Sequence, residues 1–220
     1  MQYKKLSFIL VFYIIYQIIF IFYFMGHIYF ILWVSGSGKW TLISNIKKLN
    51  LPNIHIPLSY KTRTKRENEV NWIDAWFISR ENFFSWVQKG EFLEYALIHE
   101  LDYYGTKFKD VIDNWVNLWK IVIKELDIIG LQELKKNKPE LDEKYTTIFL
   151  NIPENILRER IKKRWVFMSN EELQRRINSS IMEEQKAKEL CDFIIDATKS
   201  EEEVLKEVLK IIQNKLWKFI

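Results

Sequence analysis

A loop of small residues followed by a lysine carries the clearest chemistry in this sequence. The apolar run Phe30–Val34 leads into Ser35-Gly36-Ser37-Gly38-Lys39-Trp40-Thr41, and apolar residues at helical spacing follow (Leu42, Ile43, Ile46). Strand, glycine loop, lysine and helix is the order of a phosphate-binding loop. In such a loop, backbone N–H groups, the helix dipole and the lysine ammonium hold phosphate oxygens. We therefore expect this stretch to bind the phosphates of a nucleotide.

Two positions depart from the pattern G-x-x-x-x-G-K-[ST] of such loops. Trp33 stands at the first glycine, and Trp40 stands at the hydroxyl position after Lys39. Gly36, Gly38, Lys39 and the neighbouring Thr41 are present. Taken literally, these two tryptophans violate the consensus, whereas the strand before the loop and the helix after it fit a well-formed phosphate-binding loop.

The rest of the chain alternates between strand-like and helix-like patterns, which predicts an α/β fold with a parallel sheet covered by helices on both faces. Gly90 is expected to end the helix before it. We expect strands at 27–32, 54–59, 73–79, 121–127, 147–152 and 193–195, and helices at 41–50, 80–89, 107–119, 157–163, 170–190 and 200–219.

Bulk composition indicates one domain of ordinary size. The chain has 220 residues, 48% of them hydrophobic, and a formal net charge of +4, which is too mild for a dedicated nucleic-acid surface. Its one cysteine, Cys191, excludes an internal disulfide and fits a cytoplasmic protein. His27, His55 and His99 show no metal-ligand spacing.

The N-terminal segment 1–24 is a separate case. After Lys4 and Lys5 it is uncharged and rich in aromatic residues and isoleucine. Its length would span a bilayer, but a buried strand follows almost at once. The alternatives are an upstream extension preceding a true start at Met25, a membrane anchor, or an extra soluble element; a membrane association is the less favoured. Residues 25–220 form the predicted domain.

Five segments in order give the chain a resemblance to the guanylate kinase family over residues 27–212. Besides the phosphate loop, residues 59–66 (SYKTRTKR) resemble the pattern S-x-T-T-R-x-P-R, and residues 90–94 (GEFLE) are similar to G-E-F-L-E. Residues 103–106 (YYGT) match Y-Y-G-T, and Arg164, Trp165, 169–172 and 175–176 resemble R-G-x-x-S-E-E…R-R.

The resemblance implies a P-loop nucleoside monophosphate kinase that phosphorylates GMP to GDP with ATP and Mg²⁺, acting as a monomer or homodimer. It implies a GMP-binding lobe at about 57–108 and a lid at about 160–177. The implied ATP site is the loop Ser35–Thr41. The implied GMP site is Ser59, Arg63, Arg66, Glu94, Tyr104, Thr106 and Asp127, and the implied catalytic cations are Lys39, Arg160, Arg164 and Arg176.

Each implied role has a chemical reason. Guanine presents two donors on one edge, and a carboxylate such as Glu94 accepts both at once. Phosphoryl transfer needs positioned cations rather than covalent chemistry. Glu125 and Asp127 follow a buried run, where carboxylates face the cleft of an open α/β sheet. Thr41 and Glu125 are the weak candidates for residues near Mg²⁺. The alternatives are purely structural roles. Arg63, Arg66 and Glu94 could be solvated surface charges, Glu125 and Asp127 could be strand-end caps, and Arg160 could form a salt bridge within its helix.

Tryptophan occupies five positions at which the resemblance places glycine in the family, with serine as the alternative at position 40: Trp33, Trp40, Trp72, Trp119 and Trp165. The chain has nine Trp and only six Gly. Chance would not concentrate a large residue at positions chosen for positive φ or close backbone approach. Our hypothesis is that these codons are UGA, read as glycine in the living cell. Two lesser departures are Ala75, at a tyrosine of the family, and Lys65, at its proline.

Two other function classes stay open on sequence alone. If Trp33 and Trp40 are genuine, the chain would bind ATP poorly and would fit a guanylate-kinase-like protein-interaction module. The retained ATP-side cations argue against that class. A membrane-anchored nucleotide sensor depends on residues 6–25 alone.

Overall fold

The computed structural model describes residues 26–34, 36–98, 101–118, 120–164 and 169–217. The predicted N-terminal extension, Ser35, His99, Trp119 and Trp165 lie outside these ranges. Among the described residues, no helix is long and apolar enough to cross a bilayer.

A five-stranded parallel sheet forms the core, in the order β2-β7-β1-β8-β9. Its strands are β1 (His27–Trp33), β2 (Ile54–His55), β7 (Ile121–Glu125), β8 (Tyr145–Asn151) and β9 (Phe193–Asp196). β1 lies at the centre and is buried from His27 to Leu32, as expected for a strand covered on both faces. The predicted parallel α/β core is confirmed.

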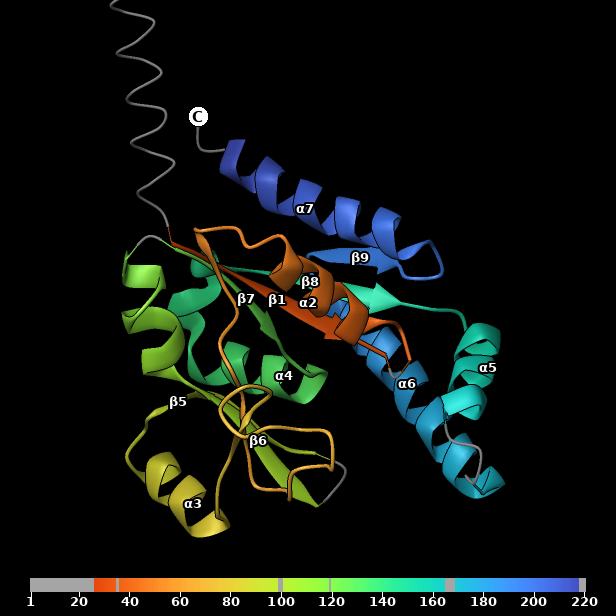
Figure 1. The fold of residues 1–220 in the computed structure, drawn as a ribbon, viewed down its shortest axis with the longest axis horizontal. Coiled ribbons are helices and arrows are strands. Elements are labelled where there is room, and N and C mark those ends of the chain that lie inside the picture. Colours follow the sequence, from red (N-terminus) through yellow and green to blue (C-terminus); the bar gives the residue numbers. More distant parts are fainter. Residues whose placement is uncertain (1–25, 35, 99–100, 119, 165–168, 218–220) are drawn as a thin grey trace, which may run out of the picture.

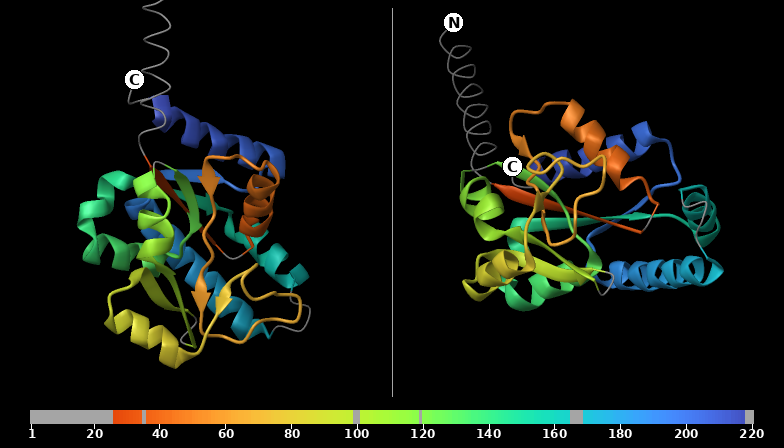
Figure 2. Two further views of the ribbon diagram at one scale, coloured as in Figure 1. Left: turned by 60° about the vertical axis from the view of Figure 1, so that its left-hand side comes forward. Right: turned by 60° about the horizontal axis from the view of Figure 1, so that its bottom comes forward.

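Helices cover both faces of this sheet (Figures 1 and 2). On one face α2 (Lys39–Lys48) packs beside α7 (Glu201–Trp217), and on the other lie α4 (Ile128–Asn137) and α6 (Asn170–Leu190). α5 (Glu154–Arg164) packs against α6. The apolar faces of these helices supply core residues such as Leu42, Leu131 and Val208.

A second sheet lies below the core in Figure 1, in the order β4-β3-β6-β5. It consists of β3 (Tyr60–Lys61), β4 (Trp76–Phe77), β5 (Phe92–Ile98) and β6 (Asp102–Lys107), with α3 (Arg80–Gln88) beside it. β3 pairs with β4 in parallel, whereas the β3–β6 and β6–β5 pairs are antiparallel. Phe83, packed on Phe92, centres a small separate core.

Several predicted elements differ from the structure. The strand expected at 54–59 is only Ile54–His55, with 56–59 irregular, and the one expected at 73–79 is only Trp76–Phe77, because a turn occupies 72–74. The helix expected at 107–119 is a π-helical turn at Lys109–Asp113 and a 3₁₀ turn at Val116–Leu118. α2 begins two residues before position 41, and α4, β5 and β6 were not predicted.

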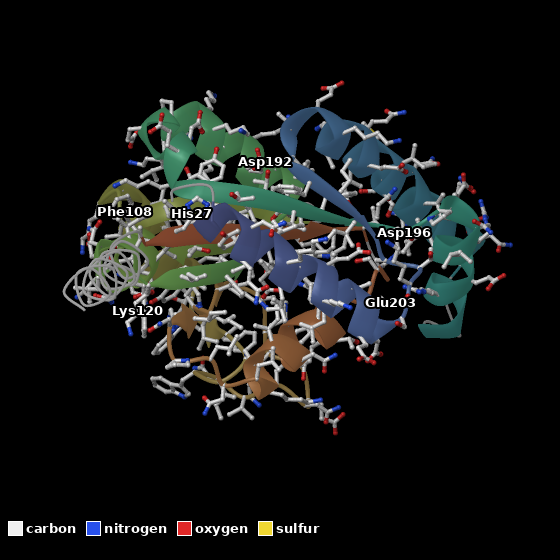
Figure 3. The ribbon with its side chains drawn as sticks, turned by 90° about the horizontal axis from the view of Figure 1, so that it is seen from above. His27, Phe108, Lys120, Asp192, Asp196 and Glu203 are labelled. Atoms are coloured by element: carbon white, nitrogen blue, oxygen red, sulfur yellow. The ribbon has the colours of Figure 1, made fainter. Side chains whose placement is uncertain are left out.

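All strands of the core sheet run the same way, so their carboxyl ends lie together. Figure 3 looks down on α7 and places His27, which begins β1, and Lys120, which precedes β7, at one end and Asp196, which ends β9, at the other. The His27 amide donates to the Lys120 carbonyl at 3.2 Å. The phosphate loop therefore opens at the carboxyl end of the sheet, next to the end of β7.

One tryptophan adopts a backbone conformation that favours glycine. Trp72 has φ +70°, and its amide donates to the Ala75 carbonyl at 2.9 Å in the turn before β4. A residue with a Cβ costs roughly 1–2 kcal/mol in this region of conformational space. Trp72 is 67% exposed, so the free energy gained by burying its side chain offsets little of that strain. This geometry supports the hypothesis of glycine at position 72.

We expect Trp72→Gly to raise the free energy of unfolding by about 0.5–1 kcal/mol, the relieved strain less the backbone entropy of glycine. Urea unfolding measures the change. Trp86→Gly is the matched control: Trp86 lies within α3, half-buried with its ring 5.4 Å from that of Tyr60, and its loss should cost about 3 kcal/mol or more. Destabilisation by Trp72→Gly would contradict the reading of this turn.

Candidate active site

A cavity of about 100 Å³ lies between the carboxyl end of β7 and the second sheet. The phosphate loop, the strand β5 and the segment entering β3 all reach it. Its lining contains six predicted site residues, namely Lys39, Ser59, Glu94, Tyr104, Glu125 and Asp127, together with Trp33, Lys61, Ile98, Gly105 and Leu126. Residues from five separate segments of the sequence thus meet at one place.

Lys39 and Glu125 form the ion pair at the phosphate-loop end of this cavity. Lys39 Nζ lies 2.5 Å from Glu125 Oε2, because Lys39 begins α2 after the glycine loop that follows β1, while Glu125 ends the adjacent strand β7. Burial alone would raise the pKa of Glu125. The charges of Lys39, Lys124 and Lys61 outweigh burial and lower that pKa to about 2. Glu125 is therefore a firmly ionised carboxylate.

Trp33 lies directly beneath this lysine. Lys39 Nζ is 3.5 Å from the centroid of the Trp33 ring, a cation–π contact, and the indole lines the cavity. Trp40, the other tryptophan in the loop, is 45% exposed at the start of α2. Gly36 and Gly38 have φ +85° and +89°, so the loop itself has the conformation that its glycines allow.

Glu94 lies at the opposite, buried part of the cavity. It is 7% exposed on β5, and its Oε2 would lie 3.0 Å from a Cβ placed on Gly130 of α4, so that glycine allows the close approach. Burial, with a smaller contribution from the Asp127 carboxylate, raises the pKa of Glu94 to about 7. Thr106 and Lys124 act in the opposite direction and limit this rise. This carboxylate is poorly solvated and is available to a partner with two donors.

Thr106 and Asp127 flank Glu94 but differ in their bonding. The Thr106 hydroxyl is buried and makes no hydrogen bond of normal geometry with a described residue, although it is close enough to lower the pKa of Glu94. Asp127 caps α4 by accepting from the Gly130 amide at 2.7 Å. Burial raises the pKa of Asp127. The strand-end cap considered from sequence is therefore real, and the same carboxylate also lines the cavity.

Arg63, just past the end of β3, and Tyr104 of the neighbouring strand β6 form a pair. Arg63 Nε donates to the Tyr104 hydroxyl at 2.8 Å, and its two terminal nitrogens bind Glu69 at 2.6 and 2.5 Å. This bidentate contact raises the pKa of Arg63 and lowers the pKa of Glu69 to about 2. Sequence reasoning missed Glu69, since a separation of six residues in a turn has no periodic signature.

Lys124 is a second residue that sequence reasoning missed. It is 1% exposed on β7, and its ammonium donates to Ser59 Oγ at 2.6 Å and to the Pro57 carbonyl at 3.2 Å. Burial lowers the pKa of Lys124 to about 8. These bonds fix Ser59 in the cavity. A charged residue inside an apolar strand run was the available signal, but the pattern alone did not show where it points.

Of the remaining predicted residues, those whose side chains the structure describes do not line the cavity. Arg66 is exposed, and its backbone amide donates to Glu69 at 2.8 Å. Arg160 reaches the phosphate loop, donating to the carbonyls of Gly36 at 3.1 Å and Ala197 at 3.3 Å. Arg176 lies half-buried on α6 and has a bonding partner. Arg164 lies on α5, and its side chain is outside the described part of the structure.

The fold and this site together define a class of protein. A phosphate-loop nucleotide-binding enzyme has a central parallel sheet, a glycine loop between its first strand and the next helix, and a lysine at the end of that loop. This chain has all three, with the loop between β1 and α2 and Lys39 facing the end of β7. A family model described as guanylate kinase matches residues 25–215, and the chain belongs to the guanylate kinase family.

Similar proteins agree with this assignment. The chain is 34% identical over 189 residues to the guanylate kinase of Helicobacter pylori (strain ATCC 700392 / 26695), which covers 84% of this chain and 87% of that protein. It is 36% identical over 143 residues to the guanylate kinase of Thermotoga maritima, covering 63% and 64%. The solved guanylate kinase of Anaplasma phagocytophilum shares the fold, with a TM-score of 0.67 at 21% identity over 88% of this chain and 87% of that one.

The raised pKa of Glu94 predicts a pH-dependent stability. Between about pH 4.5 and 7 the native state holds a proton that the unfolded state releases, so Glu94 makes the protein less stable as pH rises through this window. The free energy of unfolding of Glu94→Gln minus that of the wild type should therefore increase between pH 4.5 and pH 8. We expect this increase to be up to about 3 kcal/mol. Urea unfolding at both pH values measures it. Glu67→Gln, at an exposed position, controls for the lost charge, and a pH-independent difference would contradict the prediction.

Proposed function

We propose that this cavity holds GMP with its base at Glu94 and its phosphate towards Lys39, so that ATP bound on the phosphate loop phosphorylates it. The chain is a nucleoside monophosphate kinase, and the reaction is the transfer of the terminal phosphoryl group of ATP to GMP, giving ADP and GDP. The observation that carries the residue assignment is that Lys39 and Glu94 line one cavity.

Base recognition follows from the buried acceptors. Glu94 can accept from both N1–H and the 2-amino group of guanine, and the free Thr106 hydroxyl beside it offers a further hydrogen bond. Ser59, held by Lys124, and Asp127 complete the polar lining around the base. Adenine has an acceptor at N1 and no 2-amino group, so it would leave the buried Glu94 carboxylate without donors.

Phosphate recognition uses the cations and hydroxyls at the other end. Arg63, oriented by Glu69 and Tyr104, and Arg66 are assigned to the GMP phosphate, with the Tyr104 hydroxyl. The loop residues Ser35–Thr41 are assigned to the ATP phosphates. Arg160, already against the loop, and Arg164 and Arg176 on α5 and α6 are assigned to the transferring group. Such a ring of cations stabilises the charge of the transition state without covalent chemistry.

The residues present fit a magnesium ion carried with ATP. Mg²⁺ in such sites takes most of its ligands from phosphates and water and few from protein. Glu125, ionised at the end of β7, and the half-buried Thr41 in the first turn of α2 would supply oxygens directly or through water. When bound, the ion neutralises charge on the phosphates. The described residues contain no cluster of three or more His, Cys, Asp or Glu side chains that could hold a metal unaided.

The protein-interaction alternative has less support. A module without catalysis would not need an ion-paired Lys39 at the phosphate loop together with Arg160 against the same loop. We propose a cytoplasmic enzyme that takes GMP and ATP as its partners. The predicted boundaries of the GMP-binding lobe and the lid, and the choice between monomer and homodimer, remain predictions.

Lys39→Ala tests the assignment of the phosphate loop. We expect it to abolish detectable conversion of GMP to GDP while GMP still binds, because the lysine acts on the ATP phosphates and not on the base. A coupled ADP-release assay gives turnover and calorimetry gives the GMP affinity. Lys47→Ala, in the last turn of the same helix, should leave both unchanged. Activity retained in Lys39→Ala would contradict the assignment.

Trp33→Gly tests whether the indole obstructs the loop. Because the ring lines the cavity under Lys39, we expect its removal to tighten ATP binding by about tenfold or more, equivalent to roughly 1.4 kcal/mol. Trp76→Gly, at a tryptophan outside the cavity, should not tighten it. Unchanged ATP affinity in Trp33→Gly would contradict the obstruction. Peptide mass spectrometry of the protein from its native cells reads positions 33, 40 and 165 directly.

A further inference from the structure

Lys61 is a buried cation that points into the cavity. It ends β3, is 6% exposed and lines the cavity, whereas its neighbour Tyr60 packs into the small core of the second sheet. This alternation is that of a strand with one face on a core and one on a site. The family pattern given above has threonine at this position, so the lysine is a particular feature of this chain.

The other cations around the cavity have contact partners. Lys39 is paired with Glu125, Arg63 with Glu69, and Lys124 donates to Ser59 and Pro57. The Lys61 ammonium, in contrast, forms no hydrogen bond or ion pair with any residue in the described ranges, although its backbone carbonyl accepts from the Ile78 amide at 3.0 Å. Its Nζ lies 5.2 Å from the ring centroid of Tyr104, its pairing partner on β6. A buried ammonium without a partner is costly unless something supplies the missing charge.

The surroundings of Lys61 place it at the phosphate end of the cavity. The charged groups that act on it are Glu125, Lys39, Arg63 and Glu69. Those that act on Glu94 are instead Asp127 and Lys124, with the Thr106 hydroxyl beside them. Lys61 therefore lies among the groups assigned above to the phosphates and to Mg²⁺, and on the base side it acts only on Lys124, which holds Ser59, and not on Glu94.

We propose that Lys61 Nζ binds the 5′-phosphate of GMP directly, as a cation additional to Arg63 and Arg66. The proposal rests on the proposed function of the site. A phosphate oxygen would give the ammonium a charge-assisted hydrogen bond, and the ammonium would offset the repulsion that the acceptor phosphate feels from the phosphates of ATP. Cation–phosphate contact also explains why the chain tolerates a buried lysine there.

Lys61→Met tests this role, since methionine keeps the length of the side chain and removes the charge. We expect the Kd for GMP to rise about ten- to a hundredfold, the usual range for a hydrogen bond to a charged group. The affinity for guanosine, which lacks the phosphate, and the affinity for ATP should stay within about twofold. The melting temperature of the ligand-free protein should rise, because an unpaired buried charge is gone.

Lys107→Met is the matched control. Lys107 lies on β6 of the same sheet and pairs with Glu91 at 2.7 Å, but it does not line the cavity. Its replacement should leave the GMP affinity unchanged. Calorimetric titrations of the full chain with GMP, guanosine and ATP give all the affinities.

Three outcomes would overturn the proposal. Unchanged GMP affinity in Lys61→Met would show that the lysine does not contact the phosphate. Parallel losses for GMP and guanosine, with a lower melting temperature, would show a structural role. Loss of ATP affinity instead of GMP affinity would place the lysine on the other nucleotide. Failure of the wild-type protein to bind or phosphorylate GMP would refute the proposed function itself, a result that is separate from all three.

Discussion

The parallel pairing of β1 with β7 is the constraint on which the site depends. Ile31 of β1 lies opposite Glu125 of β7, and the Leu126 amide donates to the Ile31 carbonyl at 3.1 Å, so β7 ends beside Ile31 while β1 continues to Trp33. The chain leaving β1 turns through the glycine loop to Lys39, and the chain leaving β7 turns at Asp127 into α4. The ion pair of Lys39 with Glu125 closes the gap between these two turns. A slip of one residue would remove it, because alternate side chains point to opposite faces.

Charge is concentrated at this point and is mostly balanced within the protein. Glu94, Glu125 and Asp127 are carboxylates around one small cavity, and Lys39, Lys61 and Lys124 are the ammonium groups among them. Burial pushes the pKa of Glu94 up and that of Lys124 down, whereas the direct lysine contact holds that of Glu125 low. Groups with such divergent environments can serve different ends of one substrate, a base at the buried carboxylate and a phosphate at the cations.

The tryptophans test how far backbone geometry constrains side-chain identity. Trp72 adopts φ +70° in a tight turn, and Trp33 fills space beside the phosphate-loop lysine. Both positions were flagged because the family has glycine there, and the structure gives each a physical reason: conformational freedom at 72 and room for a ligand at 33. Trp76 is different, since it stacks on Tyr60 with centroids 5.9 Å apart and contributes to the small core. A tryptophan with packing partners is consistent with a genuine aromatic residue.

The sequence by itself determined the parallel α/β core, the phosphate loop, the family and most residues that line the cavity. These features depend on local order along the chain: an apolar run, glycines, a lysine and a helical pattern, or short motifs at fixed spacing. Only the tertiary structure decided which charges meet. Glu69 reaches Arg63, Lys124 reaches Ser59 across 65 residues, and Lys61 turns into the cavity. The short strand β3 and the irregular turns at 109–118 were likewise beyond local pattern, and β2 and β4 are shorter than the predicted strands, because pairing with distant strands, and not propensity, fixes elements of a few residues.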